Sequence, residues 1–134
     1  MTRIAMSIGA TLAITYAVAF LVYGGASALI GLQPPSGVSP AEFLLSVLVV
    51  KLGLAVGFVL LFSLARKTWT PRWALYALVW WSTFAITEVG QAIGPSYSWL
   101  EAGTGIIAEA IYCPLAALVT AKLLGTAERD AMAT

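Results

Sequence analysis

The class of this chain is decided by residues 41–65, which read AEFLLSVLVVKLGLAVGFVLLFSLA. Only Glu42 and Lys51 carry charge in this stretch. A membrane-spanning helix needs about 20 consecutive, predominantly apolar residues, so the stretch predicts one. Three further apolar runs of similar length lie at residues 4–32, 73–94 and 99–124. The sequence therefore predicts an all-α integral membrane protein.

The composition points to lipid as the main solvent of the chain. Of its 134 residues, 60% are hydrophobic and 10% are charged, and the mean hydropathy is +0.93. A soluble domain carries about 25% charged residues, so this chain has too few to cover a surface that faces water. The net charge of +1 gives no basis for nucleic-acid binding. We expect the lipid bilayer as its surroundings and no nucleic-acid partner.

The residue types also narrow the choice of cofactor. The chain has no histidine, which excludes haem ligation by imidazole within this chain and removes a common zinc ligand. Cys113 is the single cysteine, so no internal disulfide can form. The sequence contains no glycine-rich phosphate loop, CxxC pair or serine nucleophile elbow. We expect no cofactor and no metal ion.

The connections between the runs predict an up-down four-helix bundle in one domain, residues 1–134. They cover residues 33–40, 66–72 and 95–98, and such short links join antiparallel neighbours. Lysine and arginine occur in the middle link and near both ends of the chain, but not in the first and third links. The positive-inside rule then places both termini and the middle link in the cytoplasm. We expect a multi-pass protein of a cell membrane, of the prokaryotic inner-membrane type.

Three ionisable residues inside the apolar runs form the candidate site. A charge at bilayer depth costs at least ~2.5–3.5 kcal/mol on insertion scales, so it usually faces a partner or a cavity. At ~1.5 Å per helical residue, Glu88, Glu109 and Lys51 lie about 9, 12 and 14 Å from the outer boundary. Because these depths are similar, we expect the three side chains to meet in the outer half of the bilayer. Glu88 and Glu109 are the candidate proton donors or acceptors.

Helical spacing adds neighbours to these acids. Trp81, Phe84 and Gln91 share a stripe with Glu88, so Gln91 could reach its carboxyl while the two aromatic rings wall the space below. On the next run, Tyr112 and Cys113 share a face with Glu109. Pro114 removes a backbone hydrogen bond and leaves the Ala110 carbonyl free. In the first run, Tyr16 and Tyr23 could supply hydroxyl groups to the acids.

Several of these residues also have simpler interpretations. Lys51 could form a structural ion pair with Glu88 or Glu109 that locks the helices together. Glu42 and Glu101 stand at helix N-termini, where a carboxylate complements the helix dipole. An aromatic belt at the two membrane interfaces accounts for Trp69, Trp73, Tyr97 and Trp99.

Two GxxxG motifs, at residues 53–57 and 90–94, predict close helix packing. The spacing does not distinguish contacts within the chain from contacts between copies. A homo-oligomer through these faces is therefore a further expectation.

Three functions fit this pattern. The first is a small permease or channel subunit in which Glu88 and Glu109 bind a proton or small cation and Lys51 competes for them. The second is a membrane enzyme in which a buried glutamic acid protonates a lipid or isoprenoid-like substrate, a lipophilic small molecule. The third is an accessory subunit of a membrane complex, whose buried charges meet those of a partner.

Overall fold

The computed structural model describes residues 1–33, 37, 39–95 and 97–125, and these form helices and connecting turns with no strand among them. The helices are α1 (Thr2–Ile30), α2 (Pro40–Leu64), α3 (Arg66–Trp69), α4 (Trp73–Ile93) and α5 (Trp99–Leu124). The all-α prediction is confirmed, and the four long helices begin and end within two residues of the predicted bounds. The short helix α3, within the middle link, was not predicted. Arg129, one of the basic residues near the C-terminal end of the chain, lies outside the described residues.

Three of the described helices, α1, α2 and α5, are long and apolar enough to cross a membrane. Helix α4 is not among them, although the four apolar runs predict four spans. Polar and tryptophan side chains lower its mean hydropathy, among them Trp80, Trp81 and Glu88. The structure thus supports a membrane protein with three candidate spans among the described helices.

Two helices begin with the same hydrogen-bonded cap. The Ser39 side chain accepts the amide of Glu42 at the start of α2, and the Glu42 carboxylate accepts the Ser39 amide in return. Ser98 and Glu101 form the same capping box at the start of α5. Each box satisfies backbone amides that a helix start otherwise leaves unpaired. These contacts give Glu42 and Glu101 a structural role at their helix ends.

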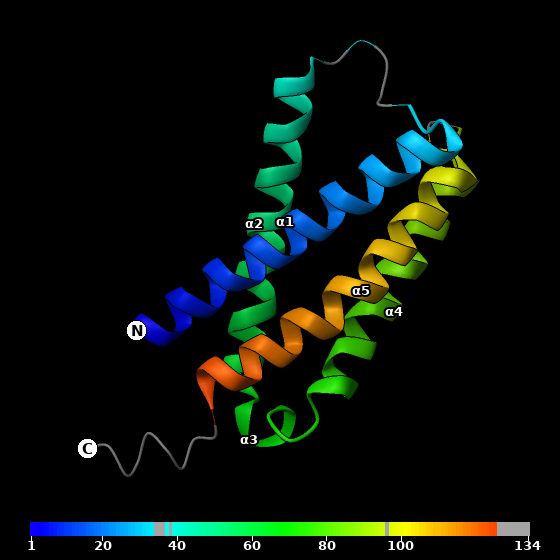
Figure 1. Cartoon of the computed structure of the whole chain (residues 1–134). Coiled ribbons are helices and arrows are strands. Elements are labelled where there is room, and N and C mark those ends of the chain that lie inside the picture. The colour runs from blue at the N-terminus through cyan, green and yellow to red at the C-terminus, as the bar shows by residue number, and fades with distance from the viewer. Residues whose placement is uncertain (34–36, 38, 96, 126–134) are drawn as a thin grey trace.

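Helix α5 lies at the centre of the molecule. It has its most extensive contacts with α1 on one side and α4 on the other, whereas α2 packs mainly against α1. Figure 1 shows α1 crossing over α2, with the N-terminal half of α2 standing apart from the α4–α5 pair. The four long helices therefore do not pack as four equal neighbours.

Small polar side chains let α1 and α5 approach each other. Ser7, Thr11 and Thr15 are buried at four-residue spacing along α1, which places them on one face. The hydroxyls of Thr11 and Thr120 lie 3.2 Å apart and share a hydrogen bond across the two helices. Such residues pack membrane helices closely, so this face joins α1 to α5.

An aromatic cluster fastens the C-terminal half of α2 to α4. The Tyr76 hydroxyl donates to the Phe58 carbonyl. The ring of Tyr76 makes edge contacts with Phe58 and Phe62 at centroid distances of 4.9 and 5.0 Å. Trp80 extends the cluster along α4 at 5.4 Å from Phe58. Helix α2 is thus anchored at one end and leans away at the other.

The GxxxG glycines do not mediate these contacts. A Cβ atom added at Gly53, Gly57 or Gly90 would meet nothing within 4 Å. Within the chain, the close packing predicted there is absent, because these glycines face away from the neighbouring helices. The one close interhelical approach at a glycine in the described residues is at Gly105.

Candidate functional site

A cleft of about 780 Å³ lies between α1, the N-terminal half of α2 and the α4–α5 connection. It exists because α2 diverges from the rest of the bundle beyond its aromatic anchor. Its apolar and aromatic walls come from both helices, and its polar groups include those of Lys51, Gln91, Tyr97 and Glu101. Lys51 and Tyr16 are the lining residues of α2 and α1 farthest from the connecting loops, so they mark the inner end of the cleft.

Lys51 connects the cleft to the interior of the bundle. Its ammonium donates a 3.1 Å hydrogen bond to the Tyr112 hydroxyl of α5 and lies 4.5 Å from the centre of the Tyr112 ring. Within the described residues, Lys51 forms no ion pair with Glu88 or Glu109. The structural ion pair considered from the sequence is therefore absent, because the phenol of Tyr112 takes the ammonium instead.

Glu109 and Tyr112 stand one turn apart on the buried face of α5. Tyr112 is 1% exposed and Glu109 is 6% exposed. In the described part of the chain, Oε2 of Glu109 is buried and has no hydrogen-bond partner. A buried polar atom without a partner is costly, so this oxygen marks a place where a proton, a water molecule or a cation would be stabilised.

Glu88 reaches across from α4 into a space that Gly105 leaves open on α5. A Cβ atom at Gly105 would lie 2.7 Å from Cδ of Glu88 and 2.8 and 2.9 Å from its two carboxyl oxygens. Such separations are far shorter than van der Waals contact. Oε2 of Glu88 is buried and, among the residues that the structure describes, unpartnered. Two neighbouring helices thus each present a buried carboxyl oxygen that lacks a partner.

Tyr97 joins this acid to the cleft, and sequence reasoning missed it. Its hydroxyl lies 3.3 Å from that of Tyr23, and both residues line the cleft. Burial and hydrogen-bonding interactions with Glu88 and Tyr23 raise the pKa of Tyr97 above its ordinary value of 10.0, so the phenol keeps its proton. The aromatic-belt interpretation concealed this role, because only the folded α4–α5 connection turns Tyr97 toward Glu88.

The charges of Lys51, Glu88 and Glu109 act on one another, although they come from three different helices. Two acids around one lysine leave a surplus of negative charge when all three are ionised. In the described ranges, no three His, Cys, Asp or Glu side chains gather as a metal site would require. The arrangement suits the uptake and release of a proton or a monovalent cation.

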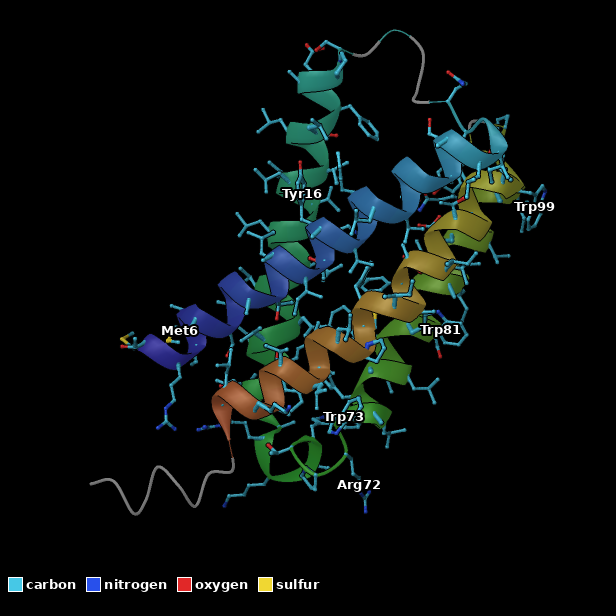
Figure 2. The ribbon with its side chains drawn as sticks, viewed as in Figure 1. Met6, Tyr16, Arg72, Trp73, Trp81 and Trp99 are labelled. Carbon is cyan, nitrogen blue, oxygen red and sulfur yellow. The ribbon has the colours of Figure 1, made fainter. Side chains whose placement is uncertain are left out.

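The two aromatic residues of the Glu88 stripe lie outside the cleft lining. The Trp81 indole donates to the Ile106 carbonyl at 3.3 Å, which places Trp81 against α5 (Figure 2). Phe84 packs between Trp80 and Tyr112, at centroid distances of 5.3 and 6.4 Å. Both therefore join α4 to its neighbours, and neither faces the open space that the stripe suggested.

Tyr16 and Gln91 do line the cleft. The Tyr16 hydroxyl donates a long, 3.5 Å hydrogen bond to the Leu44 carbonyl and so bridges α1 to α2. Figure 2 shows Tyr16 at the crossing of these helices. Gln91 is exposed to the cleft, and the described contacts include no hydrogen bond from it to Glu88.

Comparison of the chain with protein families, with curated proteins and with solved structures found no match. The function is therefore argued from the geometry of the site.

Proposed function

We propose that this chain is a small proton- or cation-coupled permease, or a channel subunit, whose working groups are Glu88 and Glu109. The observation that carries the proposal is the pair of buried, unpartnered carboxyl oxygens on α4 and α5. Ionisable groups held at bilayer depth mark ion and proton pathways more often than structural positions. The cleft supplies access to them through Tyr97 and Lys51.

The proposal includes a fourth span and an orientation. Helix α4 would cross the membrane with its most polar side chain, Glu88, turned into α5 at Gly105. The basic residues Arg66, Lys67 and Arg72 lie between α2 and α4, which supports a cytoplasmic α3 and cytoplasmic termini. The cleft would then open in the outer half of a cell membrane.

The proposed ion binding follows from the buried carboxyl oxygens of Glu88 and Glu109, which lack hydrogen-bond partners among the described residues. A carboxylate in a dry interior lacks the hydrogen bonds that water gives it. A bound proton or small cation removes this deficit. When it is released, the carboxylate is free to bind the next proton or cation. The protonated Lys51 ammonium acts on both acids, and it would compete with the transported ion for their field.

Proton flux into liposomes tests this function. With the purified full-length chain reconstituted, Glu88→Gln and Glu109→Gln should each lower the flux by about a hundredfold or more, the scale on which proton-transfer groups act. Glu42→Gln is the matched control, because Glu42 is exposed and serves only in the cap of α2, where glutamine is also accepted. Unchanged flux in both site variants would refute the proposal.

A second function is favoured by the apolar walls of the cleft, which suit a lipid-like molecule: Phe20, Phe43, Leu44, Val47 and Val50. Glu88 would then protonate a lipid or isoprenoid-like substrate as a general acid. Trp81 and Phe84 lie outside the lining, so the aromatic shield for a carbocation would have to come from other residues. Turnover of a membrane lipid extract by the purified protein, lost in Glu88→Gln, would favour this enzyme over the permease.

A further inference from the structure

The cleft is much larger than a proton or a small inorganic cation requires. Its volume of about 780 Å³ lies within the ~300–1,000 Å³ of pockets that hold small organic molecules. We propose that the cleft binds a lipophilic organic cation, such as a quaternary ammonium or phosphonium ion. This inference rests on the proposed function and names its substrate class.

The walls of the cleft fit the apolar part of such a molecule. Aliphatic side chains of α2 form one side, and aromatic rings come from α1, α2 and the α4–α5 connection: Tyr16, Phe20, Tyr23, Phe43 and Tyr97. Aromatic faces attract cations, most strongly where water is excluded. A bulky cation would thus find apolar contact and ring faces in the same space.

The charges near the cleft favour a positive guest over a negative one. Tyr97 lines the cleft and interacts with the Glu88 carboxyl. Glu101 lines it as well, and the charges of Glu88, Glu109 and Glu101 all act on Tyr23. Lys51 is the cationic residue of the lining. Of these acids, Glu101 lines the cleft, while Glu88 of α4 and Glu109 of α5 act on the lining residue Tyr23. A guest cation would be held in their combined field.

The protein already places one cation at this site. The Lys51 ammonium lies over the Tyr112 ring, a cation–ring contact that a quaternary cation can also make. Lys51 also donates a hydrogen bond to the Tyr112 hydroxyl, which a quaternary cation has no N–H to make. Lys51 is attached to α2, whose N-terminal half leans away from the bundle (Figure 1). A guest that enters the cleft would compete with Lys51 for the same negative field. Removing the lysine charge should therefore tighten binding rather than weaken it.

Two probes of the same shape and opposite charge test whether the cleft prefers a cation to an anion. Tetraphenylphosphonium and tetraphenylborate are dialysed to equilibrium against the full-length chain in detergent, and the saturable binding is measured above partition into micelles. We expect saturable phosphonium binding and little saturable borate binding. Equal or tighter binding of the borate would overturn the proposal, as would a phosphonium signal that never saturates.

Variants locate the binding. Glu88→Gln should weaken phosphonium binding by about tenfold, and Lys51→Met should strengthen it by about tenfold, the size of a charge interaction of 1.4 kcal/mol. Glu42→Gln should leave it unchanged, because the Glu42 side chain is not among those that line the cleft and its carboxylate accepts the Ser39 amide in the α2 cap. Loss of binding in Lys51→Met, in a protein that stays monodisperse and melts as the parent does, would contradict the competition. If Glu88→Gln fails to fold, Tyr97→Phe replaces it, and unaltered binding there counts against the site.

The two proposals fail in different ways. Proton flux that depends on Glu88 and Glu109, without saturable phosphonium binding, would reject the organic cation and leave the proton pathway standing. Saturable binding with the expected variant pattern, without any flux, would establish the cleft as a binding site and reject transport.

Discussion

At the scale of single residues, the candidate site depends on a glycine at position 105, where no side chain fills the space beside α4. Gly105 has no Cβ, and the Glu88 carboxyl occupies the space where one would lie. The carboxyl is thereby held against α5, near Glu109. The sequence showed that Glu88 was an unusual residue for a membrane helix, but a glycine in α5 carried no signal that it faced an acid. Only the packing of α4 on α5 reveals the pair.

Gly105→Ala should therefore impair the site more than the addition of one methyl group would suggest. The added methyl group forces the Glu88 carboxyl to move away from α5. Because this carboxyl ends a flexible side chain, stability should change little, but the acid loses its position and proton flux in liposomes should fall. Gly103→Ala is the control, because a Cβ there meets nothing within 4 Å. Both changes favour the helix equally, so the difference between them isolates the clash.

A shorter acid provides the stricter test. Glu88→Asp withdraws the carboxyl by one methylene group, so flux in the double variant Glu88→Asp with Gly105→Ala should exceed that of Gly105→Ala alone. Absence of any rescue would show that Gly105 does not act through Glu88.

At the scale of helices, α5 makes the contacts that define the bundle, with α1 on one face and α4 on the other. The interface between α5 and α1 includes the hydrogen bond between Thr11 and Thr120. Because both hydroxyls are buried, removing one leaves the other without that partner.

Thr11→Val should lower the free energy of unfolding by about 1–2 kcal/mol, the usual effect of orphaning a buried polar group. The double variant Thr11→Val with Thr120→Val should recover most of this loss, since neither hydroxyl then remains. Thermal unfolding in detergent measures both, with Thr83→Val as the exposed control. A double variant as unstable as the sum of the two single variants would argue against a stabilising pair.

The helices themselves were largely predictable, and their packing was not. Apolar length fixes where a membrane helix begins and ends, which is why the bounds agreed closely. The GxxxG motifs at residues 53–57 and 90–94 suggested contacts that the structure does not contain within the chain, because spacing identifies a smooth face but not what covers it. Similarly, a turn separates Tyr97 from Glu88 along the chain. No simple sequence pattern gives the direction of that turn, so the interaction between the two residues was not predicted.

At the scale of the whole molecule, aromatic and basic residues mark the two ends. Arg72 and Trp73 lie at the end with α3, and Trp99 lies at the opposite end (Figure 2). This distribution matches the proposed orientation, with the α3 end in the cytoplasm. The buried Cys113, the single cysteine of the chain, makes the orientation easy to test, since a buried thiol reacts slowly.

New cysteines should report opposite sides of the membrane. In intact cells, Pro95→Cys in the α4–α5 connection should react with a membrane-impermeant maleimide, whereas Lys67→Cys in α3 should react only after the membrane is opened. Both positions are exposed, and the parent chain with Cys113 alone sets the background. The reverse labelling pattern would show that the molecule is inserted the other way round.

The polar character of α4 has a consequence for how such a protein enters the bilayer during synthesis. Helix α4 is the long helix that falls short of the hydropathy of a membrane span, and its Glu88 is accommodated only against Gly105 of α5. Because few residues separate the two helices, α4 and α5 would leave the insertion machinery as one hairpin. In the proposed four-span arrangement, α5 would provide the packing surface at Gly105 that keeps Glu88 of α4 away from lipid.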